Sequence, residues 1–179
     1  MKFNKTNIDG CYLITYDVFK DSRGFFSVPY NKEEFNQKLG YDVEFIQDNM
    51  SYSNYGTIRG LHFQKGIHEQ SKLVTCCYGH VLDVIVDIRK NSPSYGVVER
   101  IELGWSLNRH VFIPKGCAHG FSVLSENAIF QYKVDNQYNK ESEGGIIYND
   151  KVLGINWMVP KENRVVSDKD LELPNFLLV

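Results

Sequence analysis

Apolar and polar residues alternate along much of the chain, and the alternation is clearest between residues 82 and 88. Every second residue there is apolar, and two of the three residues between them are aspartates. Because successive side chains of a β-strand point to opposite faces, this pattern predicts a strand over 81–88. Similar runs, separated by turns rich in Pro, Gly, Asn and Ser, predict further strands at 97–103, 109–113, 120–124 and 128–134.

One helix is predicted near the N-terminus. Asn31 can cap it, and Glu34 follows three residues later, as in a capping box. Phe35 and Leu39 would share one face of the helix, and Gly40 is placed to end it.

Short strands at regular intervals are typical of a β-sandwich or a β-barrel, and a jelly roll is one way to close such a set. The 179 residues suit one domain with a sizeable core better than two. The sequence contains no internal repeat, low-complexity tract or linker. We therefore predict an all-β protein with a few short helices, folded as a single domain over residues 1–179.

Composition narrows the function classes. A formal net charge of -2 gives no support for binding to nucleic acid or to an anionic membrane. No stretch reaches the ~20 apolar residues of a membrane span, and the first ten residues lack the apolar run of a secretory signal. The four cysteines (Cys11, Cys76, Cys77 and Cys117) have no zinc-ribbon spacing. We expect reduced thiols in a cytoplasmic protein.

The histidines are the first candidates for chemistry. His62 lies in a candidate strand over 59–64, where strict alternation would place Arg59, Leu61 and Phe63 on one face and His62, Gly60 and Gln64 on the other. On the inner face of a barrel such a histidine would line a wet cavity. Taken alone, however, any single histidine is more often structural than functional.

A metal site is the main rival interpretation. Residues 114–119 are similar to the second histidine motif of the cupin barrels, many of which bind a metal. Metal-binding cupins usually carry a closely spaced histidine pair in their first motif, whereas the corresponding region here, 62–69, has no His-x-His pair. We therefore expect no metal and no other cofactor.

Taken together, the motifs resemble those of the dTDP-4-dehydrorhamnose 3,5-epimerase family of metal-free cupins over nearly the whole chain. This resemblance implies a cupin-type jelly-roll barrel and a homodimer whose subunits exchange N-terminal strands. It also implies a nucleotide-diphosphate sugar as substrate. The matching segments occur in the family's order at 21–26, 45–51, 58–64, 71–74, 79–89, 92–96, 113–121, 132–133, 149–150 and 167–170.

The reaction implied by this resemblance is inversion of carbons 3 and 5 of a 4-keto sugar. Hydrogens on these carbons are acidified by the ketone, and histidine is a base of suitable pKa. By resemblance, His62 is the base and Asp170 orients its ring. Lys72 matches the residue that stabilises the enolate oxygen, and Tyr132 matches the acid that returns a proton to the opposite face.

Nucleotide binding is implied in the same way. Arg23 and Arg59 match arginines that contact the diphosphate, for which a planar guanidinium is well suited. The other positions that match ligand-contacting residues are Phe26, Gln47, Asn49, His119, Glu143 and Lys169.

One position departs from the family pattern. Val28 stands where the family usually carries a glutamate that contacts the nucleobase, and a valine cannot accept a hydrogen bond. The nucleotide could therefore differ from dTDP, with GDP as one candidate, and the sugar could be a hexose or a heptose. Three alternatives stay open: a related enzyme that inverts only carbon 3, a non-catalytic sugar-nucleotide-binding barrel, and a metal-dependent cupin enzyme.

Overall fold

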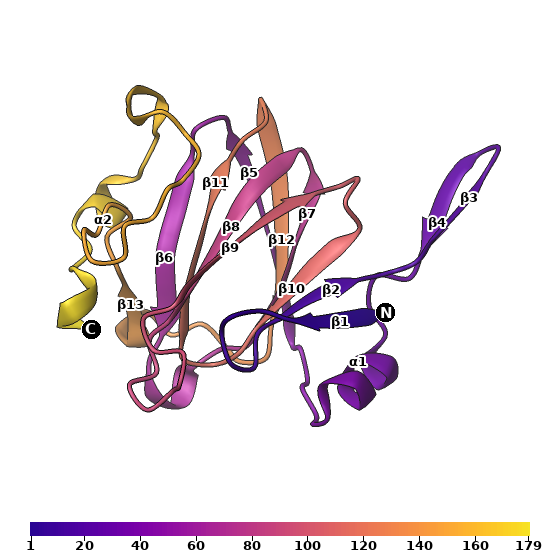
Figure 1. Cartoon of the computed structure of the whole chain (residues 1–179), viewed down its shortest axis with the longest axis horizontal. Helices are drawn as coiled ribbons and strands as arrows, with labels where there is room; N and C mark the ends of the chain where they lie inside the picture. The colour runs from indigo at the N-terminus through magenta and orange to yellow at the C-terminus, as the bar shows by residue number, and fades with distance from the viewer.

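The computed structural model describes residues 1–179 and shows two β-sheets packed face to face (Figure 1). The six-stranded sheet has the order β1 (Lys2–Lys5), β2 (Tyr12–Thr15), β10 (Arg109–Ile113), β7 (Lys72–Tyr78), β12 (Asn127–Val134), β5 (Gln47–Asn54). The five-stranded sheet has the order β13 (Glu143–Gly145), β6 (Ile58–Gln64), β11 (Cys117–Val123), β8 (His80–Asp87), β9 (Val98–Gly104). All pairings within the two sheets are antiparallel.

The all-β prediction is confirmed, and most predicted strands are shifted by only a residue or so. The strand expected at 81–88 is β8, and the one expected at 109–113 is β10 with the same bounds. The strand expected at 120–124 belongs to the longer β11, which begins at Cys117 directly after the turn. Its first residues are buried and paired with β8, so sheet pairing extends the strand beyond what local sequence indicated.

The predicted helix is α1 (Lys32–Leu39). The Asn31 side chain accepts a hydrogen bond from the backbone N–H of Glu34, and Gly40 ends the helix in a left-handed conformation with φ 87°. Phe35 and Leu39 are buried, as the pattern predicted. The other helical segments are short: η1 (Gly66–His68), η2 (Lys140–Ser142), η3 (Lys161–Asn163), α2 (Asp168–Leu171) and η4 (Phe176–Leu178). No helix is long and apolar enough to cross a membrane.

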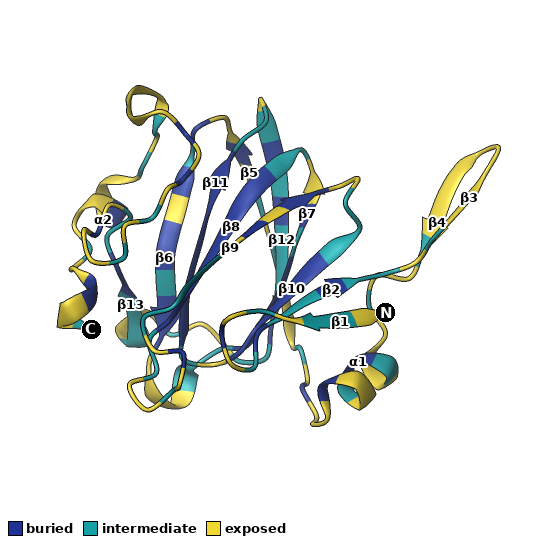
Figure 2. Cartoon of the chain, viewed as in Figure 1, coloured by how far each residue is buried: buried dark blue, intermediate teal, exposed yellow.

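The core has three parts, and the buried strands that form it stand out in Figure 2. The largest cluster lies between the two sheets and includes Val74, Ile85 and Phe130. A second cluster covers the other face of the five-stranded sheet with residues of the C-terminal segment, such as Trp157. A third lies beneath α1, around Phe35. The five-stranded sheet is therefore buried on both faces, which fits the buried apolar and acidic residues of β8.

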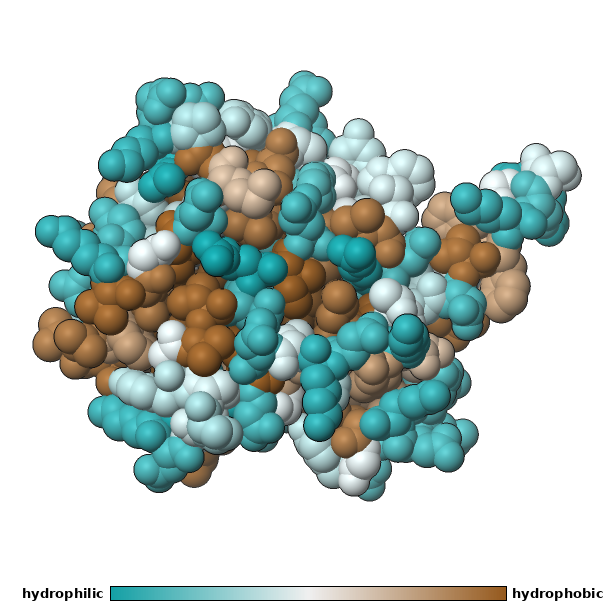
Figure 3. Space-filling view, viewed as in Figure 1, coloured by the Kyte–Doolittle hydropathy of each residue, from teal (hydrophilic) through white to brown (hydrophobic).

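A hairpin of β3 (Val18–Asp21) and β4 (Gly24–Ser27) projects from the body of the molecule (Figure 1). Phe19, Phe25 and Phe26 on this hairpin are each more than half exposed. Apolar side chains on the projection are also visible in the space-filling view (Figure 3). A two-stranded hairpin is marginally stable by itself in water, so this one needs a surface to cover it.

The facing predicted for Arg59 is wrong. Strand β6 changes register against β11 between the pairs His62–His119 and Arg59–Phe121. This bulge turns Arg59 to the same side as His62, while Leu61 stays in the core. A Cβ atom on Gly60 would come within 2.6 Å of the His119 carbonyl oxygen, so only glycine fits at the bulge.

Candidate active site

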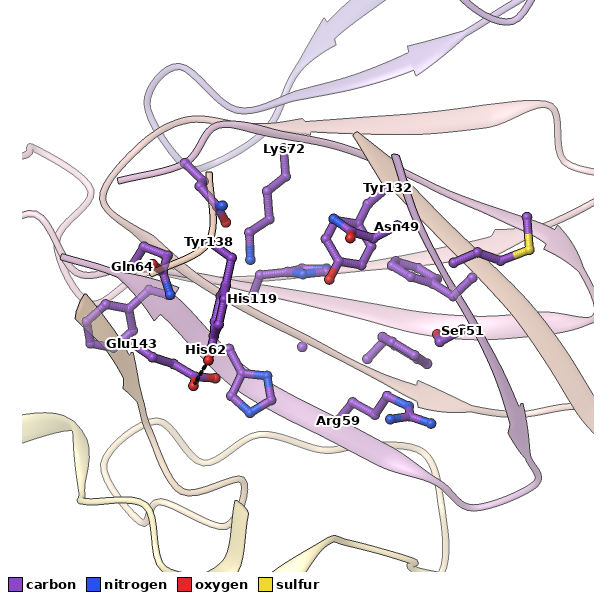
Figure 4. Close-up of a pocket in the computed structure, with 16 residues that line it drawn as sticks. Asn49, Ser51, Arg59, His62, Gln64, Lys72, His119, Tyr132, Tyr138 and Glu143 are labelled. Carbon is purple, nitrogen blue, oxygen red and sulfur yellow. Dashed lines mark hydrogen bonds between the residues drawn. The ribbon is translucent and has the colours of Figure 1, made fainter. Parts of the chain in front are cut away.

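A cavity of about 360 Å³ opens between the two sheets (Figure 4). Strands β5, β7 and β12 line it from one sheet, and β6 and β11 line it from the other. Seven of the residues predicted for the site line this cavity: Asn49, Arg59, His62, Lys72, His119, Tyr132 and Glu143.

Behind the cavity wall, Asp170 holds the His62 ring. The distance from His62 Nε2 to Asp170 Oδ1 is 2.7 Å, and the other carboxylate oxygen accepts the backbone N–H of Gly60. Asp170 lies in α2, whose first turn is capped by the Ser167 side chain. Burial acts to raise the pKa of Asp170, but the hydrogen bond and charge of His62 outweigh it, so the pKa is lowered. With Nε2 donating to this carboxylate, Nδ1 is the ring nitrogen able to accept a proton.

Lys72 and Tyr132 lie on the six-stranded sheet, on β7 and β12 respectively. The Lys72 ammonium lies 5.8 Å from the centroid of the Tyr132 ring. Lys72 is only 9% exposed, and this burial lowers its pKa to about 8. Burial also raises the pKa of Tyr132, which keeps the phenol protonated at neutral pH. The cavity therefore combines a carboxylate-supported histidine, a buried cation and a neutral phenol.

A second histidine–carboxylate pair lies in the floor of the site. His119 Nε2 is 2.6 Å from Asp83 Oδ1, and both side chains are buried. His119 also pairs with His62 across β11 and β6, so the two imidazoles occupy neighbouring strands. Asp83 was not predicted as a site residue. Its one sequence signal is an acidic side chain in an otherwise apolar part of β8.

Glu143, on β13, contacts both the loop that holds Tyr138 and helix α2 at the rim of the cavity. Its Oε2 atom accepts hydrogen bonds from the Tyr138 hydroxyl at 2.8 Å and from Lys169 Nζ at 2.7 Å. Burial acts to raise the pKa of Glu143, but these two hydrogen bonds outweigh it and lower the pKa. Lys169 is thus placed at the site through Glu143. Tyr138 also lines the cavity and was missed because it belongs to no periodic segment.

Besides Lys169, which reaches the site through Glu143, three predicted binding residues do not line the cavity. Gln47 is next to it and donates a hydrogen bond to Asn49 Oδ1 at 2.7 Å. Arg23 and Phe26 lie on the projecting hairpin, and the Arg23 side chain is 88% exposed and paired with Asp21. One chain therefore does not bring these two residues to its own cavity.

The positions of the His, Cys, Asp and Glu side chains show whether the site could hold a metal ion. No group of three or more His, Cys, Asp or Glu side chains is close enough together to hold a metal ion. The two histidines of the cavity each contact a separate carboxylate, and the cation Lys72 lines the same space.

Comparisons with known proteins identify the family. The family model for dTDP-4-dehydrorhamnose 3,5-epimerase matches residues 5–177. The chain is 44% identical over 177 residues to the dTDP-4-dehydrorhamnose 3,5-epimerase of Shigella flexneri, covering 99% of this chain and 97% of that protein.

Two solved structures agree with this assignment. The crystal structure of dTDP-4-dehydrorhamnose 3,5-epimerase from Elizabethkingia anophelis has a TM-score of 0.95 and 47% identity, covering 99% of this chain and 97% of that one. The epimerase from Legionella pneumophila, in complex with dTDP-4-keto-L-rhamnose, has a TM-score of 0.95 and 39% identity, covering 99% and 94%. The predicted cupin-type jelly roll is thereby confirmed. The chain belongs to the dTDP-4-dehydrorhamnose 3,5-epimerase family, and it is an epimerase of nucleotide-linked 4-keto sugars.

Proposed function

We propose that the cavity inverts carbons 3 and 5 of its substrate by removing and returning protons beside the 4-keto group. His62 takes the proton from the carbon through Nδ1, and Asp170 stabilises the imidazolium that forms. The electron pair of the broken C–H bond moves into the ketone, and Lys72 stabilises the resulting enolate oxygen. Tyr132 then donates its proton to the opposite face of the carbon.

After each inversion His62 holds an extra proton and Tyr132 lacks one. Exchange with water restores both groups, so solvent hydrogen enters the sugar at each inverted carbon. The observation that carries this proposal is that His62, held by Asp170, lines the cavity from the five-stranded sheet, while Lys72 and Tyr132 line it from the six-stranded sheet. A protein that only bound the sugar nucleotide would need no such set of acid and base groups.

The first test is solvent exchange in the unmodified protein. The enzyme is incubated in deuterated water with a dTDP-linked 4-keto-6-deoxy hexose, and NMR locates the label. We expect deuterium at carbons 3 and 5, and the same rate after exhaustive chelation. Label at carbon 3 alone would favour the single-centre epimerase, and binding without exchange would favour the non-catalytic barrel. Loss of activity on chelation, with recovery on adding one metal, would favour the metal-dependent enzyme.

The nucleotide preference depends on Val28, which follows β4 on the projecting hairpin and is 49% exposed. A nucleobase edge left without its hydrogen-bond partner loses about 1–3 kcal/mol. We therefore expect dTDP to bind no better than UDP, GDP or CDP, and Val28→Glu to shift the preference toward dTDP.

Calorimetric titration of each nucleotide measures this preference. Val152→Glu is the matched control, because Val152 is also exposed but lies away from the hairpin, and it should change nothing. A wild-type protein that prefers dTDP tenfold or more, about 1.4 kcal/mol, would show that Val28 is a neutral replacement.

We further propose that the working enzyme is a homodimer in which the β3–β4 hairpin reaches the partner's cavity. Arg23 and Phe26 would then contact the ligand bound to the other chain, and the exposed phenylalanines of the hairpin would be covered. An arginine suits the diphosphate at this place because its planar guanidinium can bind two oxygens together. We expect the enzyme in the cytoplasm, where its four free cysteines would stay reduced.

A further inference from the structure

Asp83 is a carboxylate in the interior of the barrel. It lies on β8 between Val81 and Ile85, which share its face and belong to the cluster between the two sheets. Asp83 is 0% exposed. An ionised carboxylate without water is costly unless positive charge or hydrogen bonds compensate it. The groups that surround Asp83 should therefore explain why an acid is kept at this position.

Only one of its two oxygens is satisfied. Oδ1 contacts His119 Nε2 at 2.6 Å, whereas Oδ2 is buried and has no hydrogen-bond partner. The single contact to His119 fixes the ring that lines the cavity, but it leaves half of the carboxylate uncompensated. A positive group nearby is needed to offset its charge.

Lys72 is a buried cation that also lacks a close partner of opposite charge. Its strand, β7, belongs to the sheet that faces the sheet of β8, and Lys72 shares its side of β7 with Val74 and Cys76, which belong to the same cluster as Val81 and Ile85. The ammonium is buried and forms no ion pair within 4 Å. Burial lowers the pKa of Lys72 to about 8, and among the titratable groups that oppose this effect the carboxylate of Asp83 is the strongest, followed by Cys117 and Glu143.

We infer that Asp83 is a positioning residue of the active site, whose buried carboxylate both fixes the His119 ring and balances the positive charge of Lys72. The inference rests on the proposed function, in which Lys72 must be protonated to stabilise the enolate. Without Asp83, burial would act on Lys72 unopposed by its main counter-charge. The ammonium would then lose its proton at a lower pH, and the site would lose its cation near neutrality.

The pH dependence of exchange tests this role. Asp83→Asn keeps the shape of the side chain and an oxygen that can accept from His119, so it removes mainly the charge. In the wild type we expect exchange to fall as Lys72 loses its proton near pH 8. Because a negative charge favours the ammonium, its removal should move this fall to lower pH by about one unit or more. An unchanged basic limb in Asp83→Asn would overturn the inference.

Asp87→Asn is the matched control. Asp87 is another fully buried carboxylate on the same strand, but it accepts hydrogen bonds from Arg89, Ser92 and Ser94, outside the cavity. Its replacement is expected to lower stability and to leave the basic limb of the pH profile in place. A shift of equal size in Asp87→Asn would show that the effect of Asp83 is general destabilisation, and would overturn the inference.

A double-mutant cycle tests, without any substrate, whether the charges of Asp83 and Lys72 stabilise each other. Denaturant unfolding is measured for Asp83→Asn, Lys72→Met and the double variant. We expect Asp83→Asn to lower the midpoint clearly less when Lys72 is already methionine, because no buried cation then lacks its counter-charge. If Asp83→Asn alone does not fold, the double variant should. Equal losses in both backgrounds, or a double variant that also fails to fold, would overturn the inference, whereas absence of exchange in the wild type would count against the proposed function alone.

Discussion

Replacing His62 with alanine is expected to lower deuterium incorporation at both carbons by about 10²–10⁴-fold, the usual contribution of a positioned general base. The same imidazole serves both carbons in the proposed reaction, so neither position should keep a fast exchange. Nucleotide binding should be nearly unchanged, because the groups expected to hold the diphosphate are arginines rather than His62. The measurement is exchange in deuterated water followed by NMR, with calorimetry for the nucleotide.

Two further variants separate a catalytic role from a structural one. Asp170→Asn keeps the size of the residue that holds the His62 ring but removes its charge, and we expect a smaller fall in exchange at both carbons. His80→Ala is the matched control, since His80 pairs with Glu102 and does not line the cavity. It should exchange at the wild-type rate. Near wild-type exchange in His62→Ala would remove His62 from the mechanism.

The sequence predicted best what depends on local periodicity. The alternation in β8 and β10 is set by the pleat of a strand, and α1 is fixed by a cap at Asn31 and a left-handed glycine at Gly40. Each of these signals acts within a few residues, so tertiary structure had little to change. The observed end of a strand differs from the predicted end where pairing with a distant strand satisfies further backbone groups, as at Cys117.

The facing of Arg59 could not be predicted from alternation. The bulge in β6 exists because Gly60 meets Gly120 on the neighbouring strand, and a side chain on either would collide with the backbone of the other strand. Such a contact joins residues far apart in sequence. One extra residue in the strand reverses the side of everything before it, so Arg59 reaches the cavity together with His62.

The site as a whole also combines features that local sequence predicts with features that only the fold brings about. Alternation indicated that His62 lines a cavity, but the groups around it come from β7, β12 and α2, which only the fold brings together. The positions of Lys72, Tyr132 and Asp170 were implied by resemblance to a family rather than by any pattern in the chain. Asp83 lies in a segment that matches the family, 79–89, but no role was assigned to it, because its partner His119 is 36 residues away.

The second large effect on exchange is expected from Arg23, which lies on the β3–β4 hairpin. Arg23→Ala is expected to lower exchange strongly, because losing an arginine contact to a buried phosphate oxygen costs about 2–5 kcal/mol. That loss alone does not say which chain supplies the arginine. Arg23 lies in the turn of the β3–β4 hairpin, which projects from the body of the molecule (Figure 1), and it does not line the cavity of its own chain, so the proposed dimer requires that it act on the partner.

Mixing two inactive variants shows whether Arg23 acts on the cavity of its own chain or on that of its partner. Arg23→Ala and His62→Ala are unfolded together in equal amounts and refolded, so that about half of the dimers should contain one chain of each kind. If the hairpin crosses to the partner, one cavity in each mixed dimer carries both defects and the other carries none. Exchange should then recover to about a quarter of the wild-type rate. Refolding of each variant alone is the control, and it should recover nothing. If mixed dimers form but exchange stays at the level of the single variants, then Arg23 serves the cavity of its own chain and the hairpin must fold back to reach it.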